Sequence, residues 1–139
     1  PRFLRRAGNR VMLDYTRMRQ VFLNLVKNAA EAIPETGGEI TLSTAYQHGV
    51  RLALSGRDRR HVLPIVASVA DNGVGISEVV RANLFEAFVT TKVNGSGLGL
   101  ALVAKLVSDH GGAVECDSVP RRTTFRVLLP VSERGDARP

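Results

Sequence analysis

Two asparagines lie one helical turn apart on the polar side of a predicted helix. The polar side chains of this helix follow one another at steps of four, four and three residues and are Gln20, Asn24, Asn28 and Glu31. This spacing places them on one helix face. Asparagine is a mediocre helix former, so two of them in mid-helix suggest amide oxygens presented to a hard cation such as Mg²⁺. Taken alone, this row of polar residues is better explained as a solvated helix face.

A second candidate segment is Asp-Asn-Gly-Val-Gly-Ile at residues 71–76, directly after a predicted strand. Gly73 and Gly75 permit positive φ and close approach of a ligand. Asp71, at the end of the strand, can accept a hydrogen bond from an exocyclic amine such as that of adenine. A strand-to-helix turn containing Asn-Gly explains the segment alone equally well. It is not a dinucleotide-binding fingerprint, because Glu78 stands where the third glycine would fall.

A third segment, Gly-Ser-Gly-Leu-Gly-Leu at residues 95–100, opens another predicted helix. Backbone N–H groups in such a loop can point at an anion, and the helix dipole adds partial positive charge. The segment fails the dinucleotide pattern because Leu100 stands where glycine is required, and the chain contains no Walker A motif. The alternative is a flexible glycine hinge before a helix.

In order and spacing, these segments resemble the GHKL ATP-binding family of sensor histidine kinases, gyrase-type topoisomerases, Hsp90-like chaperones and mismatch-repair ATPases. Residues 24–29 resemble the N box, 71–75 the G1 box, 84–92 the F box and 95–100 the G2 box. The His-Gly-Gly at 110–112 and the closing segment 123–130 fit the histidine-kinase branch. The resemblance extends over residues 14–130, which is nearly the whole chain.

One position and one insert indicate which branch of this family the chain resembles. Gyrase and Hsp90 relatives place a catalytic Glu four residues before the metal-binding Asn, where this chain has Asn24, so the resemblance implies phosphoryl transfer rather than hydrolysis. The insert at 48–64 and the run at 92–101 are most similar to NtrB-type nitrogen-regulation sensor kinases. Two departures stand out: Ala87 replaces the usual Pro of the F box, and Arg121-Arg122 replaces a turn that usually contains glycine.

The resemblance implies the catalytic and ATP-binding domain of a sensor histidine kinase, with ATP and Mg²⁺ as cofactors. It assigns Mg²⁺ to Asn28 and Asn24, and the adenine amino group to Asp71 with Thr123 nearby through water. Residues 88–97 are expected to form a lid that is mobile without nucleotide. The residues assigned to ATP are Asn24, Asn28, Asp71, Gly73, Gly75, Ile76, Phe85, Phe88, Thr90, Thr91, Lys92, Gly95, Ser96, Gly97, Leu98, Gly99, Leu100 and Thr123.

The phosphate acceptor is expected elsewhere. His48, His61 and His110 are followed by Gly, Val and Gly, and none opens a suitable helix for the acceptor motif. The resemblance therefore implies transfer of the γ-phosphate to a histidine on a separate dimerisation domain. An NtrC-like response regulator and a PII-type signalling protein are the further partners it suggests. The alternative is a degenerate GHKL module that docks a regulator without turnover.

Charge and composition limit the other classes of function. The 139 residues carry a net charge of +6, but the basic excess is concentrated in the first 19 residues and in predicted loops. Scattered solvated arginines explain this better than a nucleic-acid-binding stripe.

The longest apolar stretch, residues 98–104, is far shorter than the ~20 residues that cross a bilayer, and a cytoplasmic fragment of a longer protein is expected. The single cysteine, Cys116, excludes an intramolecular disulfide and is expected to be a buried structural thiol.

The elements that position these residues follow from hydrophobic periodicity and turn residues. Helices are predicted at 14–33, 78–82 and 98–110, and strands at 39–46, 49–54, 63–71, 113–117 and 123–129. Asp14 and Ser77 can cap helix starts, and Gly111 can end the last helix. This order predicts an α+β two-layer sandwich with helices on one face of a mixed sheet, formed by residues 1–131 and followed by a polar tail at 132–139.

Overall fold

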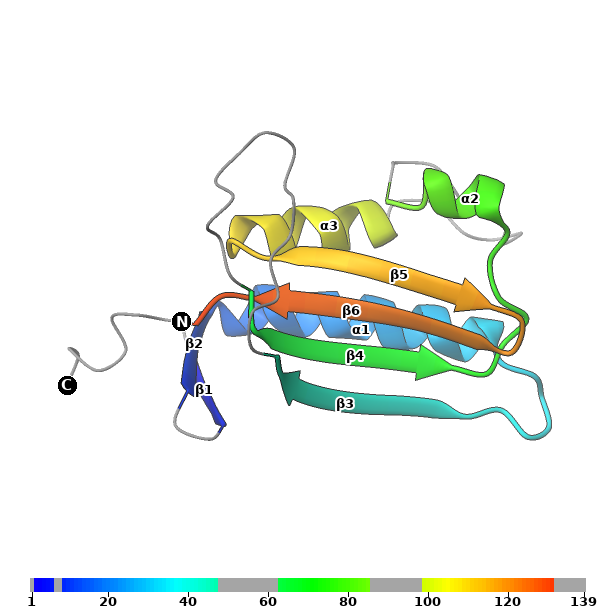
Figure 1. Cartoon of the computed structure of the whole chain (residues 1–139), viewed down its shortest axis with the longest axis horizontal. Helices are drawn as coiled ribbons and strands as arrows, with labels where there is room; N and C mark the ends of the chain where they lie inside the picture. Colours follow the sequence, from blue (N-terminus) through cyan, green and yellow to red (C-terminus); the bar gives the residue numbers. More distant parts are fainter. Residues whose placement is uncertain (1, 7–8, 48–62, 86–98, 132–139) are drawn as a thin grey trace.

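The computed structural model describes residues 2–6, 9–47, 63–85 and 99–131 (Figure 1). Its elements are β1 (Arg2–Arg6), β2 (Asn9–Leu13), α1 (Tyr15–Ala32), β3 (Ile40–Tyr46), β4 (Ile65–Asp71), α2 (Glu78–Ala82), α3 (Gly99–Asp109), β5 (Ala113–Val119) and β6 (Arg122–Leu129). The strand expected at 49–54, the lid expected at 88–97, Ala87 and the tail at 132–139 lie outside the described residues.

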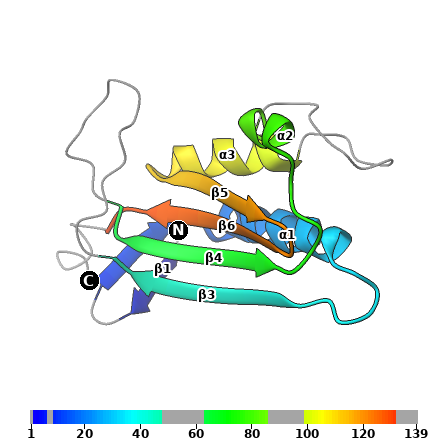
Figure 2. The ribbon, with the colours of Figure 1, turned by 45° about the vertical axis from the view of Figure 1, so that its right-hand side comes forward.

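The main sheet has four strands in the order β3-β4-β6-β5, and all three neighbouring pairs are antiparallel. The sequence predicted a mixed sheet, and this detail was wrong. The helical crossover between β4 and β5 does return the chain in the direction of β4, as a parallel connection would. However, β6 lies between these two strands, so each strand has antiparallel neighbours (Figure 1 and Figure 2).

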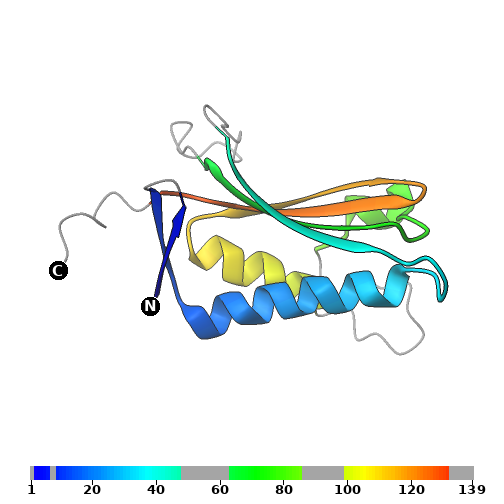
Figure 3. The same ribbon diagram turned by 90° about the horizontal axis from the view of Figure 1, so that it is seen from below.

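The two longer helices, α1 and α3, pack against each other and cover one face of the sheet, as Figure 3 shows. On α1 the buried side chains recur at helical spacing and are Met18, Val21, Leu25 and Ala29. They join a core formed by Val103, Leu106 and Val107 of α3 and by Val69, Phe125, Val127 and Leu129 of the sheet. The predicted α+β two-layer architecture is therefore confirmed. None of the described helices has the length and hydropathy needed to span a bilayer.

The predicted helix caps are present. Asp14 caps α1 by accepting a hydrogen bond from the Arg17 N–H at 3.3 Å, and the Asp14 N–H donates to Nε2 of His110 at 3.1 Å. Nδ1 of the same imidazole donates to the Leu106 carbonyl at 2.7 Å, so the ring joins the start of α1 to the end of α3. Gly111 follows α3 with a φ of +75°, as the sequence predicted.

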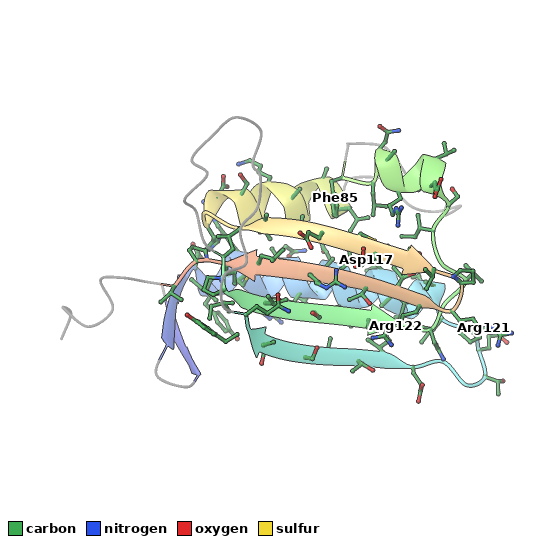
Figure 4. The ribbon with its side chains drawn as sticks, in the orientation of Figure 1. Phe85, Asp117, Arg121 and Arg122 are labelled. Atoms are coloured by element: carbon green, nitrogen blue, oxygen red, sulfur yellow. The ribbon has the colours of Figure 1, made fainter. Side chains whose placement is uncertain are left out.

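The sequence did not predict β1 and β2, which pair antiparallel as a separate two-stranded sheet. Because arginines dominate this region, its few apolar residues did not indicate strands in the sequence. Arg126 lies within β6, inside the strand that the sequence predicts at 123–129. It forms ion pairs with Asp117 and Glu115 of β5, and Asp117 is labelled in Figure 4.

Cys116 has the structural role that the sequence suggested. Its side chain is half-buried on β5 and packs against the main core. Burial raises the pKa of this thiol to about 11, although the nearby positive charge of Arg81 opposes part of the change. The thiol is therefore protonated at neutral pH, which disfavours a nucleophilic role.

The β5–β6 connection contains strained backbone. Val119 pairs with Arg122, which leaves Pro120 and Arg121 as the turn. Arg121 has a φ of +68° and is the one non-glycine residue with positive φ in the described part of the chain. Proline followed by a positive φ is typical of a type II turn, where the second position favours glycine. Figure 4 shows Arg121 and Arg122 at the tip of this hairpin.

Replacing Arg121 by glycine should stabilise the domain. Arg121→Gly is expected to raise the free energy of unfolding by about 0.5–1 kcal/mol, because it removes the cost of positive φ for a residue with a Cβ. Arg122→Gly is the matched control and should lower it, since position 122 is an ordinary strand residue. Urea denaturation of both variants tests this, and equal changes of the same sign would contradict it.

Candidate functional site

Three polar side chains lie in a row across one end of the sheet. The register pairs Asp71 of β4 with Thr123 of β6, and Thr123 with Ser118 of β5. Asp71 and Thr123 are only 5% and 4% exposed. Because side chains alternate along a strand, Asp71 lies on the same face of β4 as Val69, which packs in the core beneath the helices. The row is therefore a polar edge of the core.

Asp71 is a carboxylate in a poorly solvated position. Burial raises the pKa of this carboxyl above the ordinary value for aspartate, and the hydrogen bond from the Gly73 N–H offsets part of that rise. This N–H donates to Oδ1 of Asp71 at 2.8 Å. An ionised carboxylate can only accept hydrogen bonds, so the group favours a ligand that brings a donor.

The packing of the fold requires both glycines of the loop at 71–76, which is called here the Asp71 loop. A Cβ at Gly73 would lie 2.5 Å from the carbonyl oxygen of Ala32, at the end of α1. Gly75 has a φ of +88°, and a Cβ there would lie 3.0 Å from the carbonyl oxygen of Val119. The loop is thus packed between the end of α1 and the end of β5. That these glycines also leave room for a base remains a prediction.

Two residues that the sequence analysis missed hold this loop. Ser118 Oγ accepts a hydrogen bond from the Ile76 N–H at 2.7 Å and lies 3.0 Å from Thr123 Oγ1. Asn72 Oδ1 accepts from the Glu39 N–H, and its Nδ2 donates to the Gly37 carbonyl, both at 2.8 Å. Strand alternation places Ser118 on the face of Cys116, which is a signal that could have identified it. The contacts of Asn72 depend on tertiary structure alone.

The polar face of α1 connects two parts of the site. Asn24 Oδ1 accepts from Gln20 Nε2 at 2.8 Å, and Asn24 Nδ2 donates to the carbonyl of Gly99, the first residue of α3, at 3.3 Å. Two turns further along the same face, Ala32 contacts Gly73. Asn28 therefore lies between the start of α3 and the Asp71 loop.

This arrangement suits a cation only together with a ligand. In the described part of the chain, no three His, Cys, Asp or Glu side chains come together as a metal site. Asn28 and Asn24 supply amide oxygens, and the oxygen of Asn24 already accepts from Gln20. Mg²⁺ commonly binds through a few protein oxygens, waters and the phosphates of its ligand. The donor set therefore fits a cation that arrives with a polyphosphate.

The remaining predicted residues fall into two groups. Gly99 and Leu100 begin α3 as expected, and Phe85 packs edge-on against Phe125 with ring centroids 6.2 Å apart. Phe85 is therefore part of the core packing, and Figure 4 labels it. The others lie outside the described residues and are Phe88, Thr90, Thr91, Lys92, Gly95, Ser96, Gly97 and Leu98.

Comparison with known proteins identifies related domains. Residues 13–133 match the model of the histidine kinase-, DNA gyrase B- and HSP90-like ATPase family. The sensory histidine kinase/phosphatase NtrB of Azospirillum brasilense is 66% identical over 116 residues, which cover 84% of this chain and 29% of the relative. NtrB of Rhizobium leguminosarum bv. phaseoli is 57% identical over 115 residues, covering 82% and 30%. The chain thus spans less than a third of the length of these curated relatives.

The fold is also similar to solved structures. The crystal structure of full-length ShkA in complex with AMPPNP matches with a TM-score of 0.69 at 32% identity, covering 89% of this chain and 23% of that one. The mycobacterial sensor histidine kinase MprB matches with a TM-score of 0.68 at 29% identity, covering 88% and 78%.

Without nucleotide, Asp71→Asn should be at least as stable as the wild-type chain at pH 7. The raised pKa means that the folded state binds the proton of Asp71 more tightly than the unfolded state does. Wild-type stability therefore falls as the pH rises from the ordinary pKa of aspartate, about 4, through the raised value. The amide carries no charge to desolvate and can still accept from the Gly73 N–H.

Urea unfolding of both proteins over a pH series tests this. The advantage of the variant should shrink as the pH falls toward about 4, where the wild-type carboxyl becomes protonated in both states. A variant that is less stable at pH 7, by an amount independent of pH, would contradict the account of Asp71.

Proposed function

Because this chain belongs to the histidine kinase-, DNA gyrase B- and HSP90-like ATPase family, we propose that it is the ATP-binding catalytic domain of an NtrB-type sensor histidine kinase. The family match over residues 13–133 and the identity to two NtrB proteins, 66% and 57%, support this assignment. The structural similarity to full-length ShkA, which was solved in complex with AMPPNP, supports ATP as the ligand.

The observation that carries the proposal is the buried carboxylate at the end of the sheet. Asp71 is 5% exposed and lies at the start of a loop that two packed glycines hold in place. Adenine presents an amino group that donates to such an acceptor, whereas guanine presents a carbonyl oxygen at the same ring position and would repel it. In the proposed site, Asp71 selects adenine, and Thr123 lies beside it.

The phosphates are proposed to extend from this end of the sheet toward the start of α3. Asn28 would hold Mg²⁺, and Asn24, which already contacts Gly99, would hold the glycine-rich start of α3 in position. Backbone N–H groups of residues 95–100 would bind the phosphates, with Thr91 and Lys92 on the lid. When bound, the cation supplies charge neutralisation at the transferring phosphate, and the chain supplies positioning.

The proposed reaction is transfer of the γ-phosphate to a histidine on a separate dimerisation domain. At the position where hydrolysing relatives carry a catalytic Glu, this chain has Asn24, and a carboxamide cannot take a proton from water. We further propose an NtrC-like response regulator and a PII-type protein as partners of the whole kinase, and a cytoplasmic location. These proposals rest on the similarity to NtrB proteins.

Asn28→Ala should abolish the Mg²⁺-dependent part of nucleotide binding while the fold is retained. Loss of one protein oxygen from the cation site should weaken Mg-ADP binding about tenfold or more. Alanine is the better helix former, so α1 should not be weakened. Calorimetric titration with Mg-ADP measures the effect, with Arg19→Ala, an exposed α1 substitution, as the control. Unchanged affinity with an unchanged circular dichroism spectrum would contradict the Mg²⁺ assignment.

Transfer can be tested directly by mixing this chain with the dimerisation domain of the same kinase and labelled Mg-ATP. The expected product is an acid-labile phosphohistidine on the dimerisation domain, with little free phosphate. If Mg-ADP binds but no label is transferred, the chain is a nucleotide-binding module without turnover and the proposed activity is wrong.

A further inference from the structure

Ser118, near the end of β5, contacts two segments at the end of the sheet where the base is proposed to bind. These are the Asp71 loop and the start of β6. Resting on the proposed function, we propose that Ser118 is a positioning residue for base recognition, which acts through the Asp71 loop and the Thr123 hydroxyl. It is half-buried and is not among the residues that the family resemblance assigns to ATP.

The hydrogen-bond geometry defines what this hydroxyl does. The Ile76 N–H can only donate, so Ser118 Oγ is the acceptor in the 2.7 Å contact between them. The oxygen has a second lone pair and the hydroxyl has one hydrogen, and one of these serves the 3.0 Å contact with Thr123 Oγ1. A single serine hydroxyl therefore fixes both a backbone amide of the loop and a side chain of the next strand.

These contacts hold the Asp71 loop at both ends. At its start, the Gly73 N–H donates to Asp71 Oδ1 at 2.8 Å, and at its end the Ile76 N–H donates to Ser118. Between these two hydrogen bonds lies Val74, which is 85% exposed and contributes little packing. Asn72 and Asp71 hold the start of the loop, and Ser118 supplies the hydrogen bond at its end.

Packing around Gly75 makes the loop sensitive to the end of β5. An added Cβ at this glycine would lie 3.0 Å from the Val119 carbonyl and 3.2 Å from Ser118 Oγ, so the loop backbone is in close contact with Ser118. Without the hydroxyl, the Ile76 N–H would lose its acceptor and the Thr123 hydroxyl would be free to rotate. Both changes occur beside Asp71, at the proposed base end of the site. The proposed phosphate-binding groups, on α1 and at the start of α3, are not affected directly.

The test compares Ser118→Ala with the wild-type chain in calorimetric titrations with Mg-ATP and with inorganic triphosphate. Loss of this hydroxyl should weaken ATP binding roughly three- to tenfold, as expected for one or two neutral hydrogen bonds, and leave triphosphate binding within about twofold. A purely structural role would not change the ratio of the two affinities. Ser68→Ala is the matched control, because Ser68 is a half-buried serine on the opposite face of the same sheet and should change neither.

A second measurement needs no variant. In the wild-type chain without nucleotide, the Ile76 amide should exchange its hydrogen slowly, at a rate comparable with paired amides of β6. Unprotected exchange at Ile76, or equal loss of ATP and triphosphate affinity in Ser118→Ala, would overturn the role of Ser118. If the wild-type chain binds no ATP at all, the proposed function fails; if it binds ATP and Ser118→Ala binds equally well, only this inference fails.

Discussion

The site in this domain depends on the register in which β4 pairs with β6. That register places Asp71 opposite Thr123 at the last position of β4, on the face covered by the helices. Side chains alternate along a strand, so a shift of one residue would turn Asp71 to the open face and carry Val69 out of the core. The core residues Val69, Phe125 and Val127 therefore fix the position of a polar group that contributes nothing to hydrophobic burial.

Helix α1 connects the two halves of the proposed site. Its buried face fixes the helix on the sheet, and its polar face then reaches two elements that are distant in sequence. Asn24 contacts Gly99 at the start of α3, and Ala32 contacts Gly73 in the Asp71 loop. The same structure keeps Asp71 in a poorly solvated place, where burial raises the pKa of its carboxyl. A strong acceptor for a ligand is thus held at some expense to the stability of the unliganded fold.

Most of the architecture could be predicted from the sequence, because local rules determine it. The period of the apolar residues defined α1, and Asp14, Ser77 and Gly111 marked helix ends that the structure confirms. The antiparallel order could not be predicted, because it depends on β6 inserting between β4 and β5. Asp71 and Gly73 stand out in the sequence by residue type, but Ser118 acts only through Ile76 and Thr123. Such contacts depend on how the strands pair, which local sequence rules do not determine.

The central claim is that Asp71 and its neighbours recognise adenine. The most direct measurement is the affinity of the wild-type chain for ATP and for GTP, determined by calorimetry at the same Mg²⁺ concentration. A buried carboxylate that accepts from the adenine amine predicts that ATP binds roughly ten- to a hundredfold more tightly, because GTP would lose a charge-assisted hydrogen bond. Equal affinity for the two nucleotides would contradict this account of the site.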